Sequence, residues 1–265
     1  MSASPPRGDV PRCTSPPNQS APASSRAGWH PAIAMTLMIA CSQPQAEVPM
    51  PAPAAPVVAP VPAVEPAPLA ILDHAIPWTP VRESLTVEYL AAHRTTALSG
   101  DPERDTRMAP QVVVLHWTAG PTAKSAWNTF APARLAGRAE LQGAGALNVG
   151  AHYLVDRDGT IERLFPEDRV VRHCIGLNHI AIGIENVGGG AEWPLTDAQV
   201  EANVALVRDI AGRHAIRWVV GHQESDRIEA LPVYEERDPS YRNAKPDPGE
   251  VFTARVRAGV GDLPP

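Results

Sequence analysis

Several short apolar runs, rich in valine and isoleucine, constrain the fold of this chain more than any other feature of its sequence. Three of them lie at 111–117, 179–187 and 217–221. Runs of this length and β-branched composition are typical of buried strands. Residues 152–165 contain two more strand-like runs around an Asp-Arg-Asp-Gly turn signal at 156–159, which predicts a β-hairpin.

Helical patterns lie between and after these runs. Helices are predicted over 82–93, 122–135 and 249–258. The clearest helix begins with a capping-box sequence from Thr196 to Gln199. Its apolar residues recur on one face, at Val200, Val204, Val207 and Ala211. Because strands and helices interleave and one strand pair is a hairpin, we predict an α/β domain with a mixed central β-sheet flanked by helices.

The prolines divide the chain into two regions of different character. Of its 30 prolines, 16 fall within the first 70 residues, and residues 42–72 alternate proline mainly with alanine and valine. Such a sequence favours an extended polyproline II conformation and offers no amphipathic face for packing. We therefore expect a Pro/Ala-rich linker over 42–72, within a disordered N-terminal region, followed by one folded domain over 73–265.

Residues 1–41 resemble the signal segment of a bacterial lipoprotein. An apolar stretch of about ten residues precedes Cys41 and is too short to span a bilayer as a helix. It ends in the small residue Ala40, and Ser42 follows the cysteine, although Met38 stands where the bacterial pattern prefers leucine. The resemblance implies that a lipidated Cys41 anchors the protein in the cell envelope, on the periplasmic face of the outer membrane if the organism has one. The alternative is a disordered tail with a chance apolar patch.

The charge and the cysteines exclude several classes of protein. The formal net charge is -6 and no basic stripe is visible, which argues against a protein that binds nucleic acid. The three cysteines, Cys13, Cys41 and Cys174, form no disulfide framework and have no CxxC spacing. We expect a monomer with one globular core that neither binds nucleic acid nor depends on disulfides.

Histidines stand at the ends of two predicted strands. His116 lies near the end of the first apolar run, and His222 directly follows the third. The carboxyl ends of strands are where α/β sheets commonly bind ligands. A proline-flanked loop at 245–249 would hold the carboxylate of Asp247 rigidly. Two imidazoles and a carboxylate form the ligand set of an open catalytic zinc site, although either histidine alone is more often a structural residue.

The run that contains Glu185 has two different faces. In an extended strand, Ala181, Gly183 and Glu185 share one face, whereas Ile182 and Ile184 share the other. The isoleucine face is expected to pack in the core. The face with the small residues leaves space for a substrate beside the carboxylate.

Five segments of the chain resemble, in the same order, the signature segments of the zinc-dependent N-acetylmuramoyl-L-alanine amidases. They are VVLHWTAG, AHYLVDRDGTI, HCIGLNHIAIGIENVG, VVGHQE and KPDPG, within a region from about 73 to 260. The superfamily also includes the peptidoglycan recognition proteins and the phage amidase-type lysozymes. The resemblance implies a single zinc amidase domain and one Zn²⁺, with His116, His222 and Asp247 as its ligands.

The same resemblance implies roles for other residues. Glu185 would transfer a proton from the zinc-activated water to the departing amine, and Lys245 would help to stabilise the oxyanion. The bond hydrolysed in this family joins N-acetylmuramic acid to L-alanine, so the expected partner is peptidoglycan or a muropeptide and the expected role is cell-wall turnover or recycling. His152, His173 and Asn178 are candidate substrate contacts, with a structural hydrogen-bonding role as the alternative for each.

Two other functions stay open at this point. A recognition module would bind muropeptides without cutting them, but such modules usually lack a zinc ligand, and all three ligand positions are filled here. A zinc peptidase would cut bonds within the stem peptide, which no motif favours. The chain departs from the family at Ala151, where one branch has tyrosine, and over 223–244, an acidic loop that is longer than in the smallest members.

Overall fold

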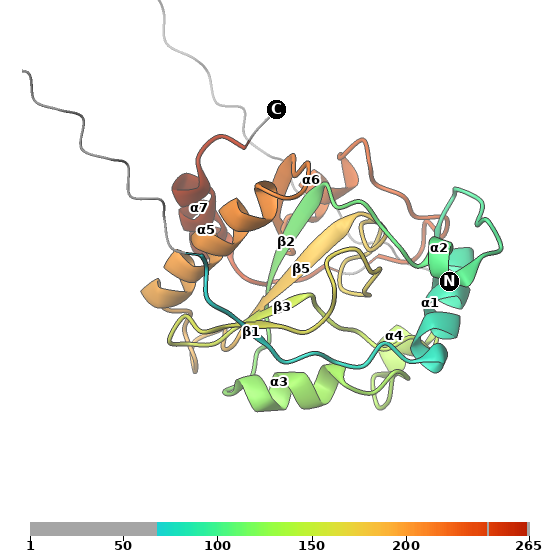
Figure 1. Ribbon diagram of the computed structural model, residues 1–265, viewed down its shortest axis with the longest axis horizontal. Coiled ribbons are helices and arrows are strands. Elements are labelled where there is room, and N and C mark those ends of the chain that lie inside the picture. Colours follow the sequence, from blue (N-terminus) through green and yellow to red (C-terminus); the bar gives the residue numbers. More distant parts are fainter. Residues whose placement is uncertain (1–67, 243, 264–265) are drawn as a thin grey trace, which may run out of the picture. The chain divides into compact units, whose positions relative to one another are not determined.

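The computed structural model describes residues 68–242 and 244–263, which form a six-stranded β-sheet flanked by helices (Figure 1). The strand order across the sheet is β1-β4-β3-β5-β2-β6. The strands are β1 (Ile71–Asp73), β2 (Val112–Trp117), β3 (Tyr153–Val155), β4 (Ile161–Arg163), β5 (Ala181–Asn186) and β6 (Trp218–Gly221). Neighbouring strands run parallel except β3 and β4, which form the predicted hairpin. The predicted mixed α/β architecture is therefore confirmed.

Helices cover both faces of this sheet. They are α1 (Pro80–His93), α2 (Pro102–Asp105), α3 (Ala123–Phe130), α4 (Ala139–Gln142), α5 (Asp197–Ala211), α6 (Ser225–Glu229) and α7 (Glu250–Val260). Helices α5 and α7 lie together on one face (Figure 1), where Leu206, Ile210 and Val256 are completely buried. Helix α3 covers the opposite face, where Phe130 packs in a cluster with Leu154 of β3.

Helix α5 begins where the sequence predicts. The Thr196 hydroxyl accepts a hydrogen bond from the Gln199 amide, and the Gln199 side chain accepts one from the Thr196 amide, so the capping box forms. Within the predicted apolar stripe, Val207 is completely buried. Val204 faces α7 instead, where a Cβ on Gly259 would lie 2.5 Å from a Val204 methyl group. The glycine therefore allows the two helices to approach closely.

Some element boundaries differ from the predictions. The helix predicted over 122–135 ends at Phe130, because Pro132 lacks the amide hydrogen that a longer helix would use. Strand β1 pairs with β4 from Ile71 onward, inside the segment expected to be linker. The short helices α2, α4 and α6 carry no pattern that predicted them. The predicted signal segment and the linker as far as residue 67 lie outside the described residues.

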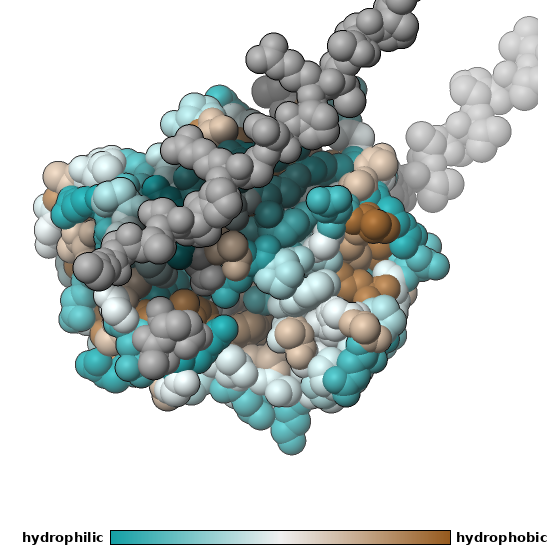
Figure 2. Space-filling view, turned by 180° about the vertical axis from the view of Figure 1, so that it is seen from behind, coloured by the Kyte–Doolittle hydropathy of each residue, from teal (hydrophilic) through white to brown (hydrophobic). Residues whose placement is uncertain are grey.

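Most large apolar side chains are enclosed between these layers. The described part of the face in Figure 2 is largely hydrophilic, and its apolar residues form small groups. Among residues 68–242 and 244–263, the large apolar side chains that are exposed are Leu72, Val81 and Val251. Within the described residues, no helix has the length and apolar character needed to cross a membrane.

Candidate active site

One end of the sheet brings three of the predicted residues together. Strands β2 and β6 are parallel neighbours in register, so His116, near the end of β2, lies beside His222, which directly follows β6. Asp247 comes from the loop before α7. Its backbone carbonyl accepts a 2.7 Å hydrogen bond from the amide of Gln223, which ties this loop to the end of β6.

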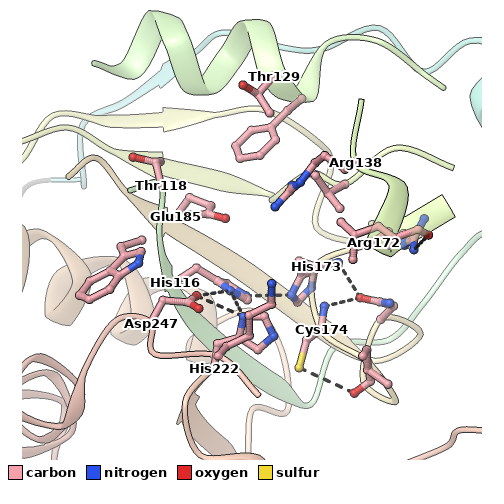
Figure 3. A pocket seen from close by; sticks show the side chains of 18 of the residues that line it. His116, Thr118, Thr129, Arg138, Arg172, His173, Cys174, Glu185, His222 and Asp247 are labelled. Atoms are coloured by element: carbon pink, nitrogen blue, oxygen red, sulfur yellow. Dashed lines mark hydrogen bonds and ion pairs between the residues drawn. The ribbon is translucent and has the colours of Figure 1, made fainter. Parts of the chain in front are cut away.

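The ligand atoms of these residues form a small triangle (Figure 3). His116 Nδ1 lies 3.0 Å from His222 Nδ1 and 3.2 Å from Asp247 Oδ2, and His222 Nδ1 lies 3.1 Å from Asp247 Oδ2. In a tetrahedral zinc site with bonds of about 2.0–2.1 Å, neighbouring ligand atoms lie about 3.3 Å apart. The triangle therefore needs only a slight expansion to hold a zinc ion.

The protonation states of the triangle also suit a cation. Burial, and then the neighbouring His222, lower the pKa of His116 to about 4, so its imidazole is neutral at physiological pH. Burial opposes the ionisation of Asp247, but the adjacent imidazoles of His116 and His222 outweigh this effect and hold its pKa well below the usual range. Neutral imidazole and ionised carboxylate are the forms that coordinate metals. The donor set therefore fits the zinc ion that the sequence predicts.

Glu185 lies beside the triangle on the neighbouring strand. Its Cα is paired with that of His116 in the parallel register of β5 and β2. Its Oε2 atom is buried and has no hydrogen-bond partner among the described residues. Burial, and then the charge of Asp247, raise the pKa of Glu185 to about 8, although Arg138 and Lys245 act in the opposite direction. A carboxyl group with a pKa in this range can exchange a proton near neutral pH.

These groups line a pocket of about 180 Å³ that is rich in cationic side chains. Lys245, Arg138 and Arg172 contribute to its walls. In Figure 3, Arg138 and Glu185 both point into the space beside the three ligand residues. Arg172 also donates hydrogen bonds to backbone carbonyl oxygens in and after α4, so it braces the wall. Sequence reasoning missed both arginines, because an arginine in a loop carries no periodic signal that separates a pocket residue from a surface residue.

Of the three residues predicted to contact substrate, two line the pocket and one does not. His173 and Asn178 line the pocket, but Asn178 Oδ1 accepts two backbone hydrogen bonds, from the amides of His173 and the residue after it. His152 is completely buried. Its Nε2 lies 2.9 Å from the Arg169 carbonyl oxygen, and its Nδ1 accepts from the Gly183 amide. The structure does not bring His152 to the pocket, because the backbone occupies both of its ring nitrogens.

The comparison with known families agrees with this arrangement of residues. A family model described as N-acetylmuramoyl-L-alanine amidase matches residues 106–250, which is more than half of the chain. The chain belongs to this amidase family. The matched region contains His116, Glu185, His222 and Asp247, so the family resemblance predicted from the five sequence segments is confirmed.

Individual relatives of this chain include phage endolysins. The endolysin of Enterobacteria phage K11 is 29% identical over 85 residues, which are 30% of this chain and 56% of the phage protein. The endolysin of Escherichia phage T7 is 47% identical over 45 residues, which are 17% of this chain and 30% of that protein. The chain thus spans little more than half the length of the K11 endolysin and less than a third of the length of the T7 endolysin.

Among solved structures, the chain is similar to the amidase LysC from Clostridium intestinale URNW. The two are 22% identical, the TM-score is 0.40, and the match covers 61% of this chain and 88% of LysC.

Proposed function

We propose that this member of the family is a peptidoglycan amidase that uses one zinc ion to hydrolyse the bond between N-acetylmuramic acid and L-alanine. The observation that carries the proposal is a complete triangle of metal-ligand atoms beside a carboxylate, Glu185, that has an unbonded buried oxygen. A site that only binds muropeptides has no need for either feature. The family supports the substrate class, and we place the activity in cell-wall turnover or recycling.

The ligand residues, Glu185 and Lys245 each have a different role in the proposed reaction. His116, His222 and Asp247 would hold the zinc ion, which would supply Lewis-acid activation of the attacking water and of the scissile carbonyl. Glu185 accepts the proton that the attacking water loses and then delivers it to the departing amine. Lys245 places a positive charge in the pocket, which stabilises negative charge as it develops on the carbonyl oxygen.

Digestion of purified muropeptides, followed by mass spectrometry, tests this function. The proposed amidase releases stem peptides with a free L-alanine amine and leaves the glycan intact. A zinc peptidase would instead release fragments cut within the stem. A recognition module would bind the muropeptide and return it unchanged, and either of these results would refute the proposal.

We further propose that the amidase is anchored in the cell envelope through a lipidated Cys41. This proposal rests on the sequence alone, because Cys41 lies outside the described residues. Wild-type protein is expected to fractionate with membranes, on the outer membrane if the organism has one, and Cys41→Ser to release it. Detection of residues 1–40 on the mature protein, or a fully soluble wild type, would contradict this assignment without touching the amidase proposal.

A further inference from the structure

His173 connects a predicted metal ligand to the backbone of β5. Its Nδ1 lies 3.1 Å from His116 Nε2, and its Nε2 lies 3.0 Å from the carbonyl oxygen of Ala181. The rings of His173 and His116 are almost perpendicular, with an interplanar angle of 88° and centroids 5.2 Å apart. His116 therefore contacts the other two ligands with Nδ1 and contacts His173 with Nε2 (Figure 3).

These contacts determine where the ring hydrogens lie. A carbonyl oxygen can only accept, so Nε2 of His173 carries the hydrogen that it donates to Ala181. Both ring nitrogens of His173 face uncharged groups, and in the neutral ring Nδ1 is then an acceptor. His116 must therefore donate from Nε2, which leaves the lone pair of its Nδ1 directed into the ligand triangle, and Asp247 Oδ2 then accepts its hydrogen bond from Nδ1 of His222. This is the tautomer that a metal ligand requires.

The surrounding structure holds His173 in this position from two sides. The backbone amide of His173 donates a 2.7 Å hydrogen bond to Asn178 Oδ1, and Asn178 Nδ2 donates at 2.9 Å to the hydroxyl of Tyr89 in α1. On the other side, a Cβ at Gly183 would lie 2.8 Å from Cγ of His173. The imidazole thus occupies space that only a glycine on β5 leaves open.

We infer that His173 is a positioning residue that fixes the tautomer and orientation of His116 and thereby sets the affinity of the site for its metal. It acts through His116 and not on the substrate, which differs from the substrate contact that the sequence suggested. The inference rests on the proposed zinc site. Partners that hydrogen-bond the second nitrogen of a ligating histidine commonly change metal affinity about 10- to 100-fold when removed.

Two substitutions at His173 separate positioning from packing. His173→Phe keeps an aromatic ring but leaves His116 Nε2 without its acceptor. His173→Asn keeps an oxygen acceptor on the atom beyond Cβ, near the position of Nδ1, so it can still receive the hydrogen of His116. In the full-length protein, we expect the Kd for Zn²⁺, measured by competition with a fluorescent chelator, to rise about 10- to 100-fold for His173→Phe and less than about fivefold for His173→Asn.

His152→Phe is the matched control. His152 is a second buried histidine whose ring lies 5.8 Å from that of His173, but it bonds only to backbone groups and touches no ligand. Replacing His152 removes two hydrogen bonds from the same region, so this variant should lose about as much stability as His173→Phe. Its affinity for zinc should stay within about twofold of the wild-type value. Equal loss of affinity in His152→Phe and His173→Phe, or wild-type affinity in His173→Phe, would overturn the inference.

Nitrogen NMR of the metal-free protein gives a readout that does not depend on zinc or turnover. Wild type and His173→Asn are expected to show His116 protonated at Nε2 alone, and His173→Phe to show a mixture of tautomers. A mixture already present in the wild type would overturn the inference. A wild type that binds zinc with the expected tautomer yet cleaves no muropeptide would refute the proposed function and leave the role of His173 standing.

Discussion

Two partly buried glutamates of this chain, Glu185 and Glu167, have opposite surroundings. Glu167, which follows β4, accepts hydrogen bonds from the Tyr153 hydroxyl at 2.5 Å and from Arg213 at 2.6 Å, and its other oxygen lies 2.6 Å from His214 Nε2. One oxygen of Glu185 has no partner among the described residues. Burial raises the pKa of both groups, but the partners of Glu167 reverse this effect and leave its pKa below the usual value, whereas that of Glu185 reaches about 8.

This contrast distinguishes a structural carboxylate from one available for chemistry. Glu167 connects β3 to the residues after α5, and a buried polar group whose partners are all present stabilises the elements that supply them. Glu185 faces the pocket, and its unbonded oxygen costs stability in the free protein. A group that destabilises its own fold is expected to have a role outside folding. For Glu185, which lines the pocket beside the ligand residues, that expected role is proton transfer.

The largest effect is expected from removing the metal beside Glu185. Asp247→Ala takes away the only carboxylate of the ligand triangle, so zinc binding should be lost and turnover should fall by about 10⁴-fold or more. The described domain has a core of its own on each face of the sheet, so the variant should remain folded. Zinc content by atomic absorption and a muropeptide assay check both expectations. Asp209→Ala, in an exposed ion pair with Arg213 near Glu167, is the control that should change neither.

The second prediction compares the same substitution, glutamate to glutamine, at Glu185 and at Glu167. Glu185→Gln should lower kcat by about 10³-fold with zinc content unchanged, because it removes a proton-transfer group and no ligand. Glu167→Gln should leave kcat within about twofold but lower the free energy of unfolding by about 1–3 kcal/mol, because charged partners lose their acceptor. Steady-state kinetics and denaturant unfolding of both variants test the contrast. Parallel losses of zinc and turnover in Glu185→Gln would show that Glu185 is a ligand.

The third prediction concerns the charge that Lys245 places near Glu185. Lys245→Met should lower kcat by about 10²-fold, less than Glu185→Gln, because the metal still polarises the carbonyl. Lys124, the only other lysine of the chain, is exposed on α3, so Lys124→Met is a matched control expected to keep wild-type kinetics. A loss at Lys245 as large as that at Glu185 would indicate that the lysine itself takes part in proton transfer.

Different parts of the site were predictable from the sequence to different degrees. Alternation along β5 predicted that Ile182 and Ile184 enter the core on the face opposite Glu185, because strand periodicity is a local property. The meeting of His116 with His222 followed from the placement of histidines at strand ends. Local patterns could not predict β1, since three residues are too few for periodicity and their pairing with β4 depends on tertiary context.

The roles of the other histidines could not be predicted in the same way. His152 and His173 both lie in the segments that resemble the amidase family, yet one is enclosed by backbone groups and the other bonds to a ligand. What a histidine does depends on the groups opposite its two nitrogens, and these come from residues distant in the sequence. The same limit applies to Glu167 and Glu185, which differ in their partners and not in any feature of their own segments.

The smallest expected effect, and the most direct test of the contrast, is the pH dependence of stability. The pKa of Glu185 in the folded, metal-free protein, about 8, lies above the ordinary glutamate value of 4.5, so its ionisation opposes folding as pH rises through this interval. The Tm of Glu185→Gln minus that of wild type should therefore increase from pH 4.5 to about 8 and then level off.

Glu167 should show the opposite dependence. Its pKa is lowered, so the stability that its ionised form contributes is present at pH values above the usual glutamate pKa and is lost as the pH falls below that pKa. The Tm deficit of Glu167→Gln should accordingly be largest at neutral pH and shrink on acidification. Thermal melts with a chelator from pH 4 to 9 measure both differences, and about 1 kcal/mol corresponds to roughly 2–4 °C for a chain of this size. Other titrating groups are common to each variant and wild type, so two differences that change with pH in the same direction would contradict the opposite roles assigned to the two glutamates.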